Sequence, residues 1–598
     1  MVTSLARRGP DSEGMHAWPD AVFGHRRLAI IDLSPAGHQP MLSEDGDVGL
    51  TFNGCVYNFL ELRAELESAG QRFRTRTDTE VLLRGYLAWG IDKLASKLRG
   101  MFAFAIWDQR SQALYLVRDR MGVKPLVYAD DGKCIFFAST VAALRSAGVV
   151  HEIDPQAVLE YLEFGYVSDG RTIYRESRKV PAAGIVEWRD GHRQERSYWT
   201  LPQDSGPKKV RFEEAVEETE RLLVEAVRLR LQADVPIGAL LSGGIDSSLV
   251  CWALRELNAN ITAYSVATPK EASDESRQAA ETARRIGISH EIIELPDSGE
   301  VLLDELVDAY GEPFGCSSAL GMLRVSAAVR SRATVLLTGD GGDDVFLGYP
   351  YHLNYVRAQR LARVLPPYSD AIWRIIRPVF DPLKALRRPK HFLDYATGGL
   401  GAVTRVHDGL PYFERRGMLG DRLSALELAQ RAIALDSGSA RRLLDDALAY
   451  ERKTQFTGEF MTKVDGATMY HALEARSPFL DHVLWEYAAQ LPFDVRLRGG
   501  QLKAILREIA RRRLGPEVAH RPKRGFTVPV ERWLLTRWRG VLETLLEGSE
   551  LEREGWFQPG TLRETVAAAI REQSVPVQLW HVIALERWLQ RQRAPVAA

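Results

Sequence analysis

A glycine-rich loop that follows a short apolar run constrains the fold of this chain more than any other feature. The run Val235–Leu241 has the pattern of a buried strand, and Ser242-Gly243-Gly244-Ile245-Asp246-Ser247 leads from it into a helical pattern. Glycines let backbone N–H groups approach phosphate oxygens, and the N-terminus of the following helix adds positive potential. Asp246 would repel phosphate unless a cation lay between them, and Mg²⁺ can take that place. The loop therefore predicts a site for Mg²⁺ and a nucleotide pyrophosphate.

A second glycine-rich loop carries three carboxylates. Thr338-Gly339-Asp340-Gly341-Gly342-Asp343-Asp344 follows the apolar run Val335–Leu337. Ligand-binding loops gather at the carboxyl ends of the strands in an open parallel sheet, so we expect both loops at one edge. Neither loop has the Gly-Lys-Ser/Thr of a Walker motif or a GxGxxG pattern. The alternative interpretations are a tight strand-to-helix turn for the first loop and an exposed acidic turn for the second.

Strand and helix patterns divide the chain into two predicted domains. Residues 1–200 contain short apolar runs separated by turn signals, with helical patterns over 59–69 and 78–89, which indicates an α+β domain of sheets covered by helices. Residues 201–210 are polar and rich in Pro and Gly, as expected of a linker. Strands and helices alternate in residues 211–598, which predicts an α/β domain with a parallel doubly wound sheet, and the pattern becomes mostly helical from about Tyr351 onward.

Composition excludes several classes of protein. Lys and Arg total 78 against 79 Asp and Glu, and this balance argues against a nucleic-acid partner bound through bulk charge. The cysteines are too dispersed for a disulfide framework or a structural zinc site. The start of the chain lacks the pattern of a signal peptide, and no apolar run has the length of a membrane span. We therefore expect a cytoplasmic protein without a membrane partner. The four cysteines are Cys55, Cys134, Cys251 and Cys316.

Further motifs extend the pattern over nearly the whole chain. They are Asp274-Glu275-Ser276, Gly348-Tyr349, Lys463-Val464-Asp465, Glu474–Asp481 and Arg521–Phe526. Together with the two loops, these motifs resemble those of the glutamine-dependent asparagine synthetases. The resemblance implies a C-terminal ATP-pyrophosphatase domain of the PP-loop type behind an N-terminal glutaminase domain. The family resemblance is also compatible with a homodimer.

The resemblance implies an adenylation reaction. The β-carboxylate of aspartate attacks the α-phosphorus of ATP, pyrophosphate leaves, and ammonia converts β-aspartyl-AMP into asparagine and AMP. By position, Asp340 and Lys503 match catalytic residues, and Asp246 and Asp343 match ligands of Mg²⁺. Many relatives carry Glu where this chain has Asp340. The positions that match ATP-binding residues are Leu241, Ser242, Gly243, Gly244, Asp246, Ser247, Val266, Thr338 and Gly339.

Residues 1–200 resemble the glutaminase domain of the family, an αββα sandwich of the N-terminal-nucleophile type. The matching segments are Arg7–Asp11, His25–Asp32, Ala36–Met41 and Arg118–Pro125. In relatives, the position of Arg27 binds the carboxylate of glutamine, the position of Asp78 binds its α-amino group, and Asn53-Gly54 supply the oxyanion hole. A planar guanidinium suits the first role because it binds both carboxylate oxygens. The positions that match glutamine-binding residues are Arg27, Leu28, Ile30, Ile31, Asn53, Gly54, Cys55 and Asp78.

Two departures from the family bear on glutamine use. Relatives begin Met-Cys-Gly-Ile and use the cysteine as nucleophile with its own α-amine as base, whereas residue 2 here is Val2. A start codon placed too far downstream and a real loss of the nucleophile both explain this difference. Cys55 stands where relatives carry Glu, and it lacks the α-amine that would make it a substitute nucleophile. We therefore expect the 598-residue polypeptide to use ammonia but not glutamine, with an inactive glutaminase half.

Two alternative functions stay open at this point. A relative of the same family could amidate another carboxylate, on a cell-wall, sugar or natural-product substrate, and the stretch from Tyr351 to about Ala440 has few family motifs and would shape the acceptor site. A protein without catalytic activity, acting as a regulator or scaffold, is the second alternative. The intact phosphate loop, the acidic loop and Lys503 argue against it.

Overall fold

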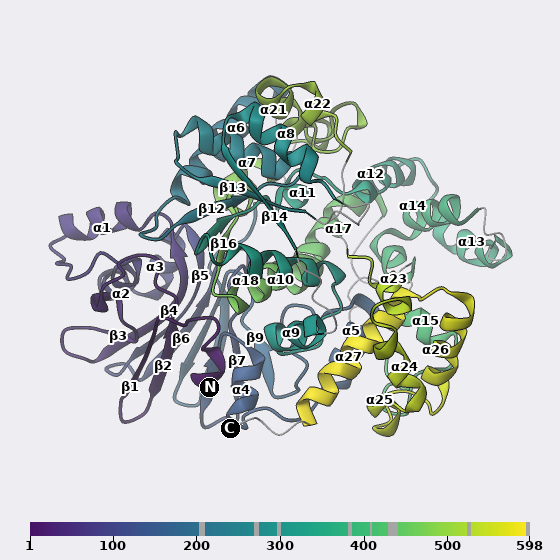
Figure 1. The fold of residues 1–598 in the computed structure, drawn as a ribbon, viewed down its shortest axis with the longest axis horizontal. Coiled ribbons are helices and arrows are strands. Elements are labelled where there is room, and N and C mark those ends of the chain that lie inside the picture. Colours follow the sequence, from purple (N-terminus) through teal and green to yellow (C-terminus); the bar gives the residue numbers. More distant parts are fainter. Residues whose placement is uncertain are drawn as a thin grey trace.

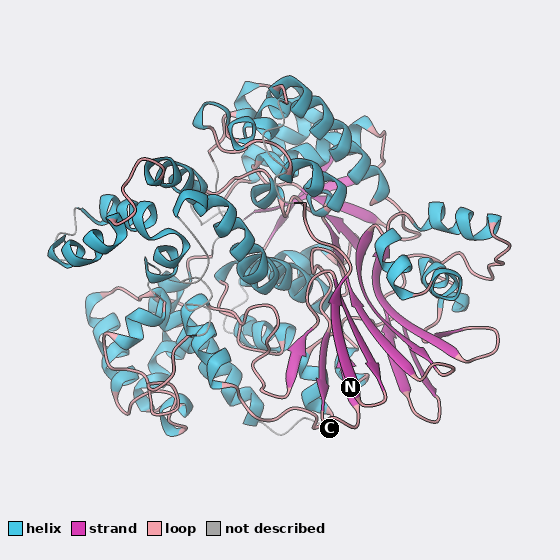
Figure 2. Ribbon diagram, turned by 180° about the vertical axis from the view of Figure 1, so that it is seen from behind, coloured by secondary structure: helices cyan, strands magenta, loops and turns pink. Residues whose placement is uncertain are grey.

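The structure is a computed structural model that describes residues 1–202, 210–267, 274–295, 301–380, 386–406, 409–428, 440–522 and 528–593. It forms two domains, with sheets gathered in the N-terminal part and helices around a smaller sheet in the C-terminal part (Figures 1 and 2). The predicted linker, residues 201–210, lies mostly outside the described residues. Its bounds remain a prediction.

The N-terminal domain is built from eleven strands and five helices within residues 1–202. The strands are β1 (Ser12–Ala17), β2 (Val22–Arg27), β3 (Met41–Leu42), β4 (Val48–Val56), β5 (Gly100–Asp108), β6 (Ala113–Arg118), β7 (Val127–Asp130), β8 (Ile135–Ala138), β9 (Ser177–Lys179), β10 (Gly184–Arg189) and β11 (His192–Ser197). The helices are α1 (Phe59–Ser68), α2 (Asp78–Trp89), α3 (Ile91–Lys97), α4 (Val141–Ser146) and α5 (Pro155–Phe164). The helices expected over 59–69 and 78–89 are therefore confirmed.

Alternating side chains on β5 explain how this domain forms four layers. The strands β11-β10-β6-β5-β4-β3 make one antiparallel sheet. Phe102, Phe104 and Ile106 point from β5 into the core beneath α1, α2 and α3. Ala103 and Trp107 point the other way, into a core shared with β2 and β7. Since successive strand residues face opposite sides, one strand serves both cores. Helices α4 and α5 cover the far side, which gives the expected αββα order.

The C-terminal domain has a fully parallel five-stranded sheet in the order β14-β13-β12-β15-β16. The strands are β12 (Ile237–Leu240), β13 (Thr262–Ala267), β14 (Ser289–Glu294), β15 (Val335–Leu337) and β16 (Glu474–Arg476). Strands β12 and β15 fall in the apolar runs Val235–Leu241 and Val335–Leu337, where strands were expected. The sequence pattern did not indicate β16, because two of its three residues are charged although all three are buried.

Helices surround this sheet and make up the rest of the chain. They are α6 (Phe212–Leu229), α7 (Ile245–Glu256), α8 (Ser276–Ile286), α9 (Val301–Tyr310), α10 (Ser317–Val329), α11 (Gly342–Val345), α12 (Pro350–Ala362), α13 (Ser369–Ile376), α14 (Arg387–Val406), α15 (Leu410–Glu414), α17 (Leu443–Glu451), the π-helix η6 (Arg452–Met461), α18 (Thr462–Tyr470), α19 (His482–Ala489), α20 (Phe493–Arg496), α21 (Ala504–Leu514), α22 (Pro516–Ala519), α23 (Val530–Leu535), α24 (Arg539–Glu547), α25 (Glu550–Arg553), α26 (Thr561–Glu572) and α27 (Val577–Arg593). None of the described helices combines the length and the hydropathy that a bilayer crossing requires.

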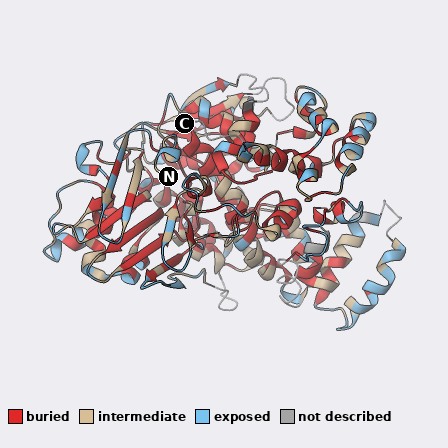
Figure 3. Ribbon diagram, turned by 90° about the horizontal axis from the view of Figure 1, so that it is seen from below, coloured by how far each residue is buried: buried red, intermediate tan, exposed pale blue. Residues whose placement is uncertain are grey.

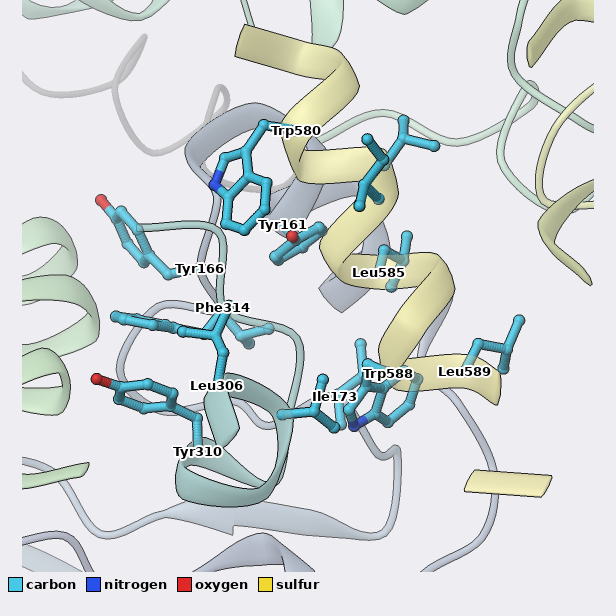
Figure 4. Packing of buried hydrophobic residues seen from close by; sticks show 14 of the residues in the cluster. Tyr161, Tyr166, Ile173, Leu306, Tyr310, Phe314, Trp580, Leu585, Trp588 and Leu589 are labelled. Atoms are coloured by element: carbon cyan, nitrogen blue, oxygen red, sulfur yellow. The ribbon is translucent and has the colours of Figure 1, made fainter. Parts of the chain in front are cut away.

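The two domains share a hydrophobic core rather than a loose contact. Helix α5 of the N-terminal domain packs against α27, near the C-terminal end of the chain, and α9 lies beside them (Figure 4). The Tyr161 hydroxyl donates to the carbonyl of His581 at 2.8 Å, and Trp580 Nε1 donates to the carbonyl of Gly315 at 2.7 Å. Many residues of this region are buried (Figure 3). The shared core fixes the two domains relative to each other.

A buried carboxylate also ties the domains together. Asp481, before α19, accepts from Arg99 Nη2 at 2.9 Å and from Arg230 Nη1 at 3.1 Å. Burial alone would raise the pKa of Asp481, but Arg230 and Arg99 outweigh it and hold the pKa below its ordinary value. Arg99 belongs to the N-terminal domain and Arg230 follows α6, so one carboxylate joins three segments.

Asp481→Asn should lower the free energy of unfolding by about 3 kcal/mol, because it leaves two arginines without a buried counter-charge. The pKa of Asp481 is depressed in the folded state, so its contribution is complete at neutral pH and fades as the pH falls below about 4. Denaturant titration at pH 7.5 and at about pH 3 checks both statements. Asp494→Asn is the matched control, since Asp494 pairs with Arg360 at 2.8 Å on the surface and should contribute less than about 1 kcal/mol. Equal effects of the two substitutions would contradict the prediction.

Candidate active site

The first glycine-rich loop is held open by its own serines. It leaves β12 at Leu241 and enters α7 at Ile245. Ser242 N donates to Ser247 Oγ at 3.1 Å, and Gly244 N donates to Ser242 Oγ at 3.1 Å. These contacts curl the backbone around the N-terminus of α7. Such a terminus, with its unpaired N–H groups and its dipole, attracts anions.

The second loop lies directly against the first. It connects β15, the neighbour of β12 in the sheet, to α11. A Cβ at Gly339 would lie 2.8 Å from Ser247 N, and a Cβ at Gly342 would lie 2.7 Å from Asp246 Cγ. Neither position has room for a side chain. The glycines therefore allow the two loops to meet, as the expectation of a common sheet edge required.

Lys503 joins the two loops. Its ammonium contacts the carboxylate of Asp246 and lies 2.6 Å from Asp343 Oδ1. Lys503 directly precedes α21 and has a left-handed backbone (φ 54°), which is uncommon for a residue with a side chain. Gly348 makes the arrangement possible, because a Cβ there would lie 1.8 Å from Asp343 Oδ1 and 2.3 Å from Lys503 Cε.

Lys503 keeps its charge in this position. Burial alone lowers its pKa, but Asp246 and Asp343 outweigh that effect and raise the pKa above its ordinary value. A buried ammonium between two carboxylates can neutralise an anionic ligand that enters beside it. The described residues contain no group of three or more His, Cys, Asp and Glu side chains placed to hold a metal ion. A Mg²⁺ ion bound here would therefore take most of its ligands from phosphate and water, as this ion commonly does.

A second buried lysine, Lys463, interacts electrostatically with the acidic loop. Burial alone lowers the pKa of Lys463, and the negative potential of Cys316, Asp340, Glu459 and Asp344 more than offsets it. Cys316 Sγ donates to Glu459 Oε1 at 3.1 Å. Lys463 thus interacts electrostatically with Asp340. The sequence identifies Lys463 only as part of a motif, and this interaction was not predicted.

The remaining predicted nucleotide positions cluster around the two loops. Val266 lies near the carboxyl end of β13, and Leu241 N donates to the carbonyl of Tyr264 at 2.8 Å. Thr338 N donates to the carbonyl of Arg476 at 3.0 Å, which holds the acidic loop to β16. Arg521 was not singled out as a site residue, yet its Nη1 donates to the carbonyl of Gly243 at 3.1 Å. The rest of its motif, residues 523–526, lies outside the described residues.

A cavity of about 1110 Å³ opens in the N-terminal domain. It reaches Glu474 and Arg476 of the C-terminal domain, so it extends to the domain boundary. Arg27 donates from Nη1 to the carbonyl of Ser34 at 3.1 Å and from Nη2 to the carbonyl of Asp32 at 2.6 Å. The cavity brings together seven of the eight predicted glutamine positions: Arg27, Leu28, Ile30, Ile31, Asn53, Gly54 and Asp78.

Cys55 is the exception, because it does not line this cavity. Its side chain packs with Tyr57, Met101 and Leu229 instead. The thiol is 1 % exposed, and burial raises its pKa strongly. Neighbouring strand residues face opposite sides, so a position next to Gly54 in sequence need not share its pocket. The structure thus speaks against Cys55 as a glutamine contact and as a nucleophile, since the thiolate is the reactive form.

The carboxylate of Asp78 is buried, so replacing it with a neutral side chain should stabilise the folded protein at neutral pH. Val56 N donates to Asp78 Oδ2 at 3.0 Å, and burial raises the pKa of Asp78 from 3.8 to about 6. A raised pKa means that ionisation costs stability above pH 6 and nothing below the ordinary value. Asp78→Asn should therefore raise the free energy of unfolding by up to about 3 kcal/mol at pH 7.5 and leave it unchanged at pH 3.5.

Thermal melts at the two pH values measure this difference. Asp92→Asn is the control, since Asp92 forms an exposed ion pair with Arg196 at 2.8 Å and should shift the melting temperature little at either pH. Destabilisation of the Asp78→Asn protein at pH 7.5 would show that the charge of Asp78 is stabilised by its surroundings.

The fold and the two loops define an ATP-utilising type of α/β domain joined to an αββα amidotransferase domain. Residues 218–590 match the family model of asparagine synthase, and residues 1–199 match the glutamine amidotransferase domain. The chain therefore belongs to the asparagine synthase family.

Relatives of this family match over nearly their full length. Asparagine synthetase [glutamine-hydrolyzing] 1 of Bacillus subtilis is 30% identical over 562 residues, which cover 92% of this chain and 87% of that protein. Asparagine synthetase [glutamine-hydrolyzing] 3 of the same organism is 27% identical over 592 residues, covering 92% and 89%. Amidase chry2 of Gibberella zeae is 27% identical over 629 residues, covering 95% and 90%.

Proposed function

We propose that this protein is an asparagine synthase that adenylates the β-carboxylate of aspartate with ATP and transfers ammonia to the product. The contact of Lys503 with Asp246 and Asp343 carries this proposal. It brings one cation and two loops of backbone N–H groups to the same edge of a parallel sheet, where nucleotides bind in such folds. The similarity to glutamine-hydrolysing asparagine synthetases supports the choice of substrates.

The residues of the two loops would stabilise the departing pyrophosphate. An oxygen of the aspartate carboxylate forms a bond to the α-phosphorus, the bond from that phosphorus to the bridging oxygen breaks, and the electron pair leaves with pyrophosphate. Lys503 and the N-terminus of α7 would face the charge that develops there, in a site already organised for it. Ammonia then attacks the acyl carbon, AMP leaves, and the extra proton is lost to solvent or a neighbouring base.

We also propose that Mg²⁺ accompanies ATP in this site. Asp246 and Asp343 would hold it, one from each loop, and it would supply charge neutralisation for the pyrophosphate. The donor set fits a hard cation, since two carboxylates already converge on one positive charge. Lys503 would then move its contacts from the carboxylates to the phosphates. The protein as a whole would work in the cytoplasm, where ATP and aspartate are available.

The N-terminal cavity is the proposed glutamine-binding site of this protein. Arg27 and Asp78 would bind the carboxylate and the α-amino group of glutamine within this cavity. The cavity extends to Glu474 and Arg476, and Arg476 belongs to the strand that holds Thr338 of the acidic loop. This contact links the two sites through β16.

A panel of carboxylate acceptors tests the proposal. AMP release from Mg-ATP is measured with aspartate, with glutamate and without an acceptor, each with ammonium and then with glutamine. We expect release that depends on aspartate and on ammonium. Release without any dependence on aspartate would contradict the choice of acceptor.

A second candidate keeps the adenylation and changes the acceptor. The match to a fungal amidase over 95% of this chain favours it, as does Asp340 in place of the Glu that many relatives carry. This candidate would be supported if AMP were not released with aspartate but were released with a larger carboxylate, such as an acidic sugar or a peptide side chain.

A further inference from the structure

An apolar stripe on α13 faces solvent at the outer end of the molecule. Helix α13 and the following turn η3 (Arg377–Phe380) form the tip at the far right of Figure 1, away from both proposed sites. Spacings of four, three, one and three residues place the stripe on one face of the helical segment. The exposed fractions are 63% for Tyr368, 49% for Ile372, 78% for Ile375, 42% for Ile376 and 73% for Val379.

Contacts on the opposite face of α13 hold this stripe toward solvent. Trp373 is buried on the opposite side, and its Nε1 donates to Asp394 Oδ1 of α14 at 2.8 Å. Arg377 Nε donates to the same oxygen at 2.7 Å, and the ring of Trp373 stacks on Phe380. The buried contacts thus use one face of the helix and leave its apolar face uncovered. Contiguous exposed apolar residues of this kind mark interaction surfaces.

The surroundings of the stripe are basic. Residues 351–395 contain nine Lys and Arg but three Asp and Glu, in a chain whose net charge is −1. Arg374 pairs with Asp370 and Arg377 with Asp394. Arg363 and Arg388 are exposed and form no ion pair within the part of the chain that the structure describes. The binding partner should therefore be negatively charged.

We propose that this stripe, Tyr368, Ile372, Ile375, Ile376 and Val379, inserts into the interfacial layer of an anionic lipid membrane, which revises the sequence-based expectation of no membrane partner. A second copy of the chain is disfavoured, because a two-fold contact here would bring like charges together. Protein interfaces centre on aromatic and arginine side chains, whereas this stripe is mainly aliphatic with one tyrosine. An aliphatic helix face flanked by cations matches the pattern of interfacial membrane helices.

Vesicle sedimentation of the full chain tests this proposal. The probes are phosphatidylcholine vesicles with and without 30% phosphatidylglycerol, a composition in the range of about a third anionic lipid at which surface potential attracts basic segments. We expect the partition coefficient on anionic vesicles to exceed that on neutral ones at least about tenfold and to fall with added salt. Ile375→Glu should lower binding about tenfold or more, and Arg363→Gln with Arg388→Gln several-fold.

Ile375→Ser provides a second variant of lower polarity, and both variants should keep the melting temperature and the AMP release of the unchanged protein. Equal sedimentation with and without vesicles would overturn the proposal, and so would unchanged binding of Ile375→Glu. Analytical ultracentrifugation gives a third readout. A stable dimer that Ile375→Glu dissociates would replace the membrane with a second copy of the chain. Sedimentation, melting and ultracentrifugation do not depend on the acceptor, so the membrane proposal succeeds or fails separately from the proposed reaction.

Discussion

Lys503→Met should lower the rate of AMP and pyrophosphate release at saturating ATP by at least about 100-fold. The ammonium contacts both Asp246 and Asp343, and it faces the position proposed for the leaving pyrophosphate. Removing a single preorganised donor from an active site typically costs a factor of about 100 to 1,000. The measurement is kcat for AMP formation with aspartate and ammonium.

Gln501→Met is the matched control for this substitution. Gln501 lies two residues before Lys503 and is exposed, so the same side chain is introduced in the same segment without reaching the loops. This variant should keep its rate within about twofold, in line with the small effects of surface substitutions. A Lys503→Met protein that folds normally and keeps kcat within about fivefold would show that the ammonium does not stabilise the transition state.

Gly348→Ala should be nearly as damaging, although Gly348 takes no part in the chemistry. A Cβ at this position would lie 1.8 Å from Asp343 Oδ1 and 2.3 Å from Lys503 Cε, so both side chains must move. Misplacement of a catalytic group by about 1 Å can cost a factor of about 100 in rate. We expect kcat to fall by about that factor while the melting temperature changes by only a few degrees.

Gly417→Ala separates this effect from a general cost of replacing glycine. Gly417 has a φ of 61° and no atom within 4 Å of an added Cβ. The change should cost about 1 kcal/mol of stability through backbone strain and leave kcat unaltered. If Gly348→Ala retained full activity, the position of Lys503 between the two carboxylates would not matter for turnover.

The sequence predicted the parallel sheet and the meeting of its two loops because these depend on local patterns. Apolar runs followed by glycines indicate where strands end, and parallel pairing brings such ends together. It did not indicate β16, where Arg476 is fully buried through its pairing with Glu474 at 2.8 Å. Hydrophobic patterns carry no signal for a strand whose charges neutralise each other.

The site residues also differ in how far their roles could be predicted from the sequence. The glycines of the acidic loop could be assigned from their order in the chain, whereas the role of Gly348 depends on Lys503, more than 150 residues away. Cys55 shows the opposite case, since a position next to the predicted oxyanion residues turns into the core through strand alternation. The structure is therefore required to identify contacts between distant segments and to decide toward which side a single residue points.

Transfer of oxygen from the acceptor to AMP tests the central claim most directly. Aspartate labelled with ¹⁸O in its β-carboxylate is turned over with Mg-ATP and ammonium. The products are then separated, and the ¹⁸O content of each is measured by mass spectrometry. If the carboxylate attacks the α-phosphorus, one labelled oxygen leaves with AMP, and the pyrophosphate stays unlabelled. Formation of ADP instead of AMP, with label in inorganic phosphate, would mean that an acyl phosphate forms instead, and it would contradict the assignment of the two loops as a pyrophosphate-releasing site.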